Sequence, residues 1–166
     1  MKRTTLLVTV GVSVLALLAL VVGAALANTP SGVSAAPVTA TQITRATLGK
    51  FEAENNAIEV ESGRRSADLA IVKVVLERGG STGWHHHPGV VLVPVKAGTV
   101  TEYDAKCHKS VYKEGKGFVE SNSEVHLVRN EGDVKAVLYA TFLLPSATSP
   151  VGLTISDPQP KECHKQ

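Results

Sequence analysis

The segment over residues 79–98 reads GGSTGWHHHPGVVLVPVKAG and is the most informative part of the sequence about the fold. It holds a glycine turn, three consecutive histidines, a β-branched run and a closing Lys-Ala-Gly turn, as expected of a strand that leads into a hairpin. Alternate side chains of a strand share a face, so His85 and His87 point together while His86 points away. Two neutral imidazoles on one face can bind a single metal ion.

Similar short segments flank this stretch on both sides. They are residues 70–77 (AIVKVVLE), 99–103 (TVTEY), 117–120 (GFVE), 125–129 (VHLVR) and 134–144 (VKAVLYATFLL), separated by Gly, Asn and Asp turns. No segment after residue 27 shows a sustained helical period with caps. Only three Phe, one Trp and three Tyr are present, so the core must be aliphatic. The pattern predicts one all-β domain, a sandwich or a barrel.

The first 27 residues have a different composition. Lys2 and Arg3 precede an uncharged apolar run that ends at residues 25–27 (ALA), and this combination is typical of a secretory signal peptide. The alternative is a retained membrane anchor, because the run is also long enough to cross a bilayer. Both interpretations place the remaining chain outside the cytoplasm. We expect a flexible linker over 28–41, the domain over 42–145 and an irregular tail over 146–166.

The net charge of +2 belongs wholly to Lys2 and Arg3. Without them the chain is neutral, which excludes a nucleic-acid binder that acts through a broad basic face. Contact with a membrane is expected only through the N-terminal segment, if that segment is not cleaved.

A third candidate ligand is His126, which lies in another apolar strand. Two histidines on one face and a third on a partner strand favour a metal site. The plain alternative is that these histidines are core or surface residues whose hydrogen bonds are satisfied.

The spacing around the histidines matches a known motif. Gly79 is followed by five residues, then His85 and His87 as His-x-His, then three residues to Val91 and six to Gly98. This resembles the first motif of the cupin family, in which the position of Val91 is a glutamate.

The second cupin motif is also recognisable. Gly115 is followed by five residues, residues 121–123 (SNS), two residues, His126, three residues and Asn130. The His and Asn match, whereas SNS replaces the family's Pro-x-Gly. With the flanking strands, the resemblance covers about residues 70–144, and it is more specific for fold than for activity.

The resemblance implies a jelly-roll barrel with a site inside it. Cupins bind a divalent metal through both motif-1 histidines, the glutamate and the motif-2 histidine, which carries over here to His85, His87 and His126. Val91 cannot ligate, so the implied site is a weaker three-His site suited to Zn, Fe, Mn, Ni or Cu, with open positions for water or substrate. The opposing interpretation is an apolar barrel that binds an organic ligand, or nothing.

The two cysteines, Cys107 and Cys163, fit an oxidising compartment. A disulfide between them would tie the C-terminal tail to the loop after Tyr103, a tie that resembles one in secreted cupins. Each cysteine precedes a histidine, His108 and His164, so the alternative is a second metal site.

Three kinds of function remain open, and two of them depend on the inside of the barrel. The chain is a binding protein that captures a small ligand with or without metal, or it is a three-His metal enzyme, an oxygenase or isomerase-like. The enzyme needs a titratable group in the barrel, and Tyr103, Glu120 and Tyr139 are the candidates. A third class, an envelope interaction module, predicts an exposed apolar patch. Cupins often pair, so the resemblance leaves a homodimer open, although no residue of this sequence establishes one.

Overall fold

The computed structural model describes residues 38–121, 123–146 and 152–165. The predicted signal segment and most of the predicted linker lie outside these residues. The described elements are, in chain order, β1 (Val38–Gly49), β2 (Glu52–Glu54), β3 (Glu59–Glu61), β4 (Ala67–Leu76), β5 (His85–His86), β6 (Val90–Ala97), β7 (Thr99–Asp104), β8 (Lys109–Lys113), β9 (Gly117–Glu120), β10 (His126–Arg129), β11 (Ala136–Pro145), β12 (Ile155–Ser156) and a 3₁₀ helix, η2 (Lys161–Lys165).

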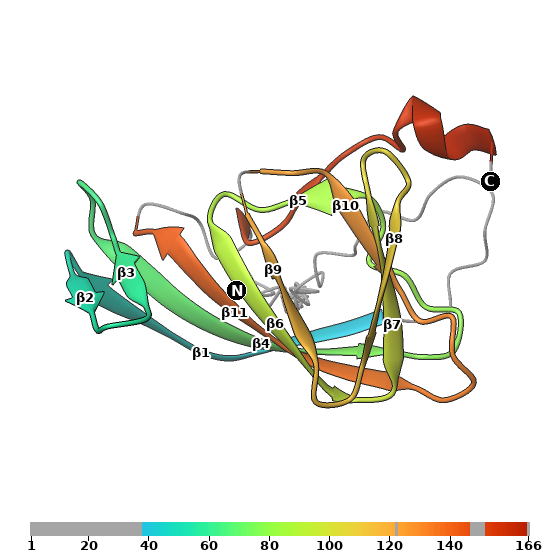
Figure 1. Ribbon diagram of the computed structural model, residues 1–166, viewed down its shortest axis with the longest axis horizontal. Helices are drawn as coiled ribbons and strands as arrows, with labels where there is room; N and C mark the ends of the chain where they lie inside the picture. The colour runs from blue at the N-terminus through green and yellow to red at the C-terminus, as the bar shows by residue number, and fades with distance from the viewer. Residues whose placement is uncertain (1–37, 122, 147–151, 166) are drawn as a thin grey trace, which may run out of the picture.

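The strands form two five-stranded antiparallel sheets and one separate hairpin. The first sheet has the order β1-β4-β11-β6-β9, the second has the order β12-β5-β10-β7-β8, and β2 pairs with β3. The two sheets enclose a common interior, and the β2–β3 hairpin projects from one end (Figure 1). The predicted all-β jelly-roll architecture is confirmed.

The core between the sheets follows from strict alternation along the central strands. On β6 the buried side chains are Val91, Val93 and Val95, and the residues between them are exposed. Strand β11 alternates in the same way over all ten of its residues. The core is aliphatic, with Phe118 and Phe142 as its buried aromatic members.

Two glycines allow close backbone approaches. At Gly98, which has a φ of 77°, the chain turns from β6 into β7, and a Cβ there would lie 2.7 Å from the carbonyl oxygen of Lys135. A Cβ at Gly89, just after the histidines, would clash with the carbonyl oxygen of Leu143. The predicted hairpin at Gly98 is therefore present, and both positions exclude a larger residue.

The domain begins earlier than the composition indicates. The predicted linker extended to residue 41, but β1 starts at Val38, and Val38–Thr41 pair in register with β4. Valine and threonine suit a strand even where the surrounding composition is typical of a linker. No helix within the described residues is both long and apolar enough to span a membrane.

Candidate metal centre

The three predicted histidines meet inside the barrel. His85 lies on β5 and is the direct cross-strand partner of His126 on β10, while His87 follows two residues after His85. The ring centroids lie 4.4–5.2 Å apart, and each residue is only 4–5% exposed. One nitrogen from each ring lies within 4.8 Å of the other two. Alternation on β5 and pairing with β10 thus produce the predicted cluster.

Backbone carbonyls set the orientation of all three rings. The Nδ1 atoms of His85, His87 and His126 lie 2.8, 2.6 and 2.8 Å from the carbonyl oxygens of Gly83, Leu153 and Glu124, respectively. A carbonyl accepts but cannot donate, so each Nδ1 carries the hydrogen. In the neutral ring the Nε2 lone pair is then free, as a metal ligand requires.

A buried carboxylate faces two of these nitrogens. Oε2 of Glu120 lies 3.2 Å from Nε2 of His87, and Oε1 lies 3.1 Å from Nε2 of His126. Glu120 is 8% exposed and ends strand β9. The candidate Glu120 is therefore a barrel-lining residue, as expected.

The charges in the cluster shift its titration. Burial alone would raise the pKa of Glu120, but the contacts with His126 and His87 outweigh it and hold that pKa at about 2. Burial lowers the pKa of His85 to about 3, helped by the neighbouring His126 and His87. Burial opposes the charged form of His126 as well, yet Glu120 raises the pKa of this ring above its ordinary value.

These groups fit a divalent cation. Nε2 of His126 is buried and makes no hydrogen bond of good geometry, even though Glu120 lies close by. An unpartnered buried nitrogen is costly, and a metal ion would satisfy it. Three imidazoles of borderline softness suit Zn, Fe, Ni or Cu, while an added carboxylate also suits Mn.

The C-terminal tail supports the histidine strand from the other side. Strand β12 pairs with β5, placing Ile155 opposite His86 and Ser156 opposite His85. Nδ1 of His86 lies 2.6 Å from Oδ2 of Asp157. His86 therefore points away from the cluster as predicted, but it is half-buried against the tail rather than a surface residue.

The two cysteines form a disulfide, with their Cα atoms 5.5 Å apart. It joins the loop after β7 to η2, so the predicted tie is present and the alternative of a second metal site is wrong. His108, beside Cys107, contacts the carboxylate of Asp104 instead.

Two predicted barrel-lining residues point elsewhere. Tyr103 packs with Trp84, Leu127 and the disulfide, on the face of the second sheet opposite His126, and its hydroxyl donates to Glu131. Tyr139 lies between the buried Leu138 and Ala140 on β11 and so faces outward. Both are excluded from the interior by the phase of strand alternation. Val91 is fully buried in the core, as expected of a barrel-lining residue.

Sequence reasoning missed Glu102 and Tyr112. Glu102 shares a face of β7 with the core residue Val100, and Tyr112, which is paired with Val100, stacks on Phe118. Burial, followed by the charge of Glu120, raises the pKa of Glu102. The alternation of Val100 and Glu102 in the sequence was the signal that could have placed Glu102 inside.

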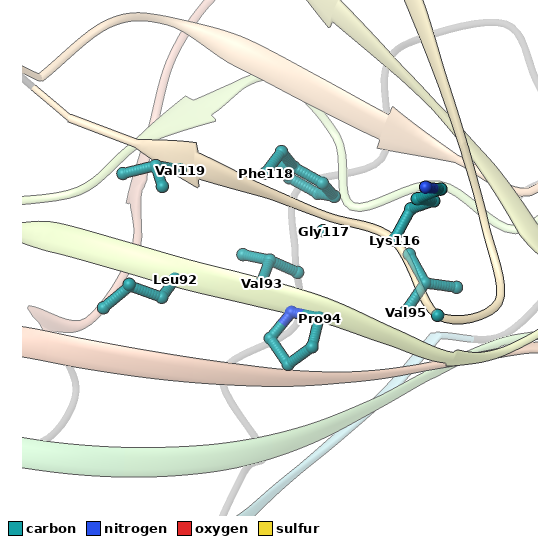
Figure 2. A pocket seen from close by; sticks show the side chains of 9 residues that line it. Leu92, Val93, Pro94, Val95, Lys116, Gly117, Phe118 and Val119 are labelled. Atoms are coloured by element: carbon teal, nitrogen blue, oxygen red, sulfur yellow. The ribbon is translucent and has the colours of Figure 1, made fainter.

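One exposed apolar hollow lies apart from the cluster. A hollow of about 370 Å³ follows the β6–β9 pair at the edge of the first sheet, and Figure 2 shows Leu92 and Val119 among its lining side chains. Both side chains are exposed. None of the cluster residues lines this hollow.

The two facing sheets, with histidines of both motifs in the interior, match the architecture that the motifs predict. The barrel has the cupin fold. Similar solved structures include a double-stranded β-helix protein from Klebsiella pneumoniae, at 19% identity and a TM-score of 0.44, covering 48% of this chain and 65% of that one. A cupin superfamily protein from Desulfitobacterium hafniense has 12% identity and a TM-score of 0.46, over 68% of this chain and 82% of that one.

A recombinant oxalate oxidase in complex with glycolate is also similar, at 21% identity and a TM-score of 0.42, over 45% of this chain and 41% of that one. The chain thus spans less than two thirds of the Klebsiella protein and of the oxidase. No protein-family model and no curated protein matches it.

Proposed function

We propose that this chain is an exported protein of cupin fold that holds one divalent transition-metal ion inside its barrel, through Nε2 of His85, His87 and His126. The observation that carries the proposal is the shared orientation of the three rings. Each Nδ1 hydrogen is directed at a backbone carbonyl, so three buried Nε2 atoms are left as ligands at one point.

A bound ion would act as a Lewis acid and offer its open positions to a small ligand with an oxygen donor. The chain's own residues orient the imidazoles through the three carbonyls and exclude bulk water with the surrounding core. Phe142 packs its ring 5.3 Å from that of His87, which restricts the rotation of the imidazole.

Export is supported by two features. The N-terminal sequence has the charge, apolar run and small residues of a secretory signal. The Cys107–Cys163 disulfide is the form that cysteines take in an oxidising compartment.

A metal-dependent enzyme is the second candidate, and Glu102 is the observation that favours it. Tyr103 and Tyr139 lie outside the interior, but Glu102 is on the interior face of β7 with a raised pKa, as a general acid or base needs. The binding function does not require this residue. Loss of turnover, but not of metal, in Glu102→Gln would identify an enzyme.

Elemental analysis of the exported, untagged protein tests the proposal. We expect close to one metal equivalent in the wild type and less than about 0.1 in His87→Ala, because a complete site survives mild purification. His108→Ala is the matched control, since it removes an exposed histidine and should leave the metal content unchanged. A wild-type protein without metal, even after incubation with Zn²⁺ or Mn²⁺, would refute the proposal.

A further inference from the structure

The carboxylate that the first motif lacks has a counterpart on the neighbouring strand. In the register of β6 and β9, Val91 is the direct partner of Glu120. Both side chains are buried and both point into the barrel. Residues directly opposite in an antiparallel pair have their Cβ atoms about 5 Å apart. Glu120 therefore reaches the interior at the same height in the barrel as a glutamate at position 91 would.

The distances around Glu120 are compatible with a shared ion. The two contacts, 3.1 and 3.2 Å, are longer than about 2.7–2.9 Å, the range typical of a charge-assisted bond, and Nε2 of His126 makes no hydrogen bond of good geometry. Two ligand atoms that each lie about 2.1 Å from one metal ion are about 3.0 Å apart at a right angle and about 3.4 Å apart at the tetrahedral angle. The observed separations fall between these two values.

The ring tautomers point the same way. With each Nδ1 hydrogen directed at a carbonyl, Nε2 of His87 and Nε2 of His126 each face a carboxylate oxygen. Nε2 of His126 is buried and makes no hydrogen bond of good geometry to that oxygen, so a metal ion fits between the two atoms. The two oxygens of Glu120 each face a different histidine, so a cation bound by these two rings is also within reach of the carboxylate.

We infer that Glu120 is the fourth protein ligand of the metal ion, supplied by β9 in place of the missing glutamate on β6. This inference rests on the proposed metal site and deepens it. The site is then formed by three histidines and one carboxylate with a net charge of −1, rather than by three neutral rings. A hard anionic oxygen shifts its preference toward Mn²⁺, Fe²⁺ and Zn²⁺ and away from Cu⁺.

The test measures affinity for Zn²⁺ by competition with a chromophoric chelator, and the visible spectrum of the Co²⁺-loaded protein. Glu120→Gln keeps the shape of the side chain and removes its charge, so we expect the Zn²⁺ affinity to fall by tenfold or more and the Co²⁺ spectrum to change. Glu114→Gln is the matched control, because it removes an equal but exposed charge away from the cluster and should behave as wild type.

The relocated variant Val91→Glu/Glu120→Val returns the carboxylate to β6 across the same strand pair. It should bind Zn²⁺ with an affinity close to that of the wild type. This result decides the question even if Glu120→Gln fails to fold. Wild-type affinity and an unchanged Co²⁺ spectrum in Glu120→Gln would overturn the role of Glu120 while leaving the three-His site intact. Absence of metal from the wild type would overturn both.

Discussion

The disulfide and the tail that it holds provide a sharp test of how the site is supported. In Cys107→Ser/Cys163→Ser the tail would remain attached by the short β12–β5 pairing and by the His86–Asp157 contact. Leu153, whose carbonyl oxygen accepts from Nδ1 of His87, lies in the same tail. The double variant therefore loosens a support of the metal site without altering a ligand.

The expected loss of stability follows from the length of the closed loop. The cysteines are 56 residues apart in sequence. In the chain-entropy model a loop of that size contributes about 4 kcal/mol by restricting the unfolded state. Since small domains are stable by about 5–15 kcal/mol, this is a large fraction of the total.

The metal affinity should fall for a separate reason. The Leu153 carbonyl fixes the tautomer and orientation of His87, and loss of such an outer partner typically lowers metal affinity by about tenfold to a hundredfold. We expect the double variant to bind Zn²⁺ more weakly by an amount within that range.

Denaturant unfolding in the presence of a chelator measures the loss of stability. Competition with a chelator in the absence of denaturant measures the loss of Zn²⁺ affinity. Wild-type protein treated with a thiol reductant serves as a second route to the open tail and should match the double variant. A free energy of unfolding that falls by less than about 1 kcal/mol, or an unchanged Zn²⁺ affinity, would contradict this role of the tail.

Two further predictions concern the core and the acid response. Asn130 is fully buried and donates to the carbonyl oxygens of Leu76 and Val134. Asn130→Ala should therefore cost about 1–3 kcal/mol for each buried group left unpaired, measured by denaturant unfolding against the exposed control Asn56→Ala; a cost equal to the control's would contradict this account. The metal-free protein should lose stability as the pH falls from 6.5 to 2, because the lowered pKa values of His85 (about 3) and Glu120 (about 2) mean that the unfolded chain binds more protons in this range. His85→Gln should flatten the upper part of this decline, and an unchanged pH profile in that variant would show that His85 is not responsible.

Much of the barrel could be predicted because its strands and turns are specified by short segments of the sequence. The glycine turns and β-branched runs define β6, the Gly98 hairpin and β11, and the His-x-His spacing places two imidazoles on one face. The partner histidine followed from the second motif, and the structure confirms that His126 joins His85 and His87.

What could not be predicted depends on register and phase. That Glu120 lies opposite Val91 is a property of the β6–β9 pairing, which no short pattern specifies. Tyr103 was a candidate for the interior because it is titratable, but the phase of its strand puts Glu102 inside instead. Strand β12 has two residues, too few to show an alternation of apolar and polar side chains, so its pairing with β5 could not be predicted from the sequence.

The position of Leu153 has a consequence for the order of events during synthesis. The first motif histidines leave the ribosome well before residue 153, yet His87 is held in its ligand tautomer by that residue's carbonyl oxygen. The β-pairing that secures the tail, and the disulfide that closes it, involve residues that are later still. A nascent chain that has completed β11 would thus have a nearly finished barrel, but His87 would not yet be held by its carbonyl partner. The proposed ion would therefore be bound only after the last part of the fold is in place.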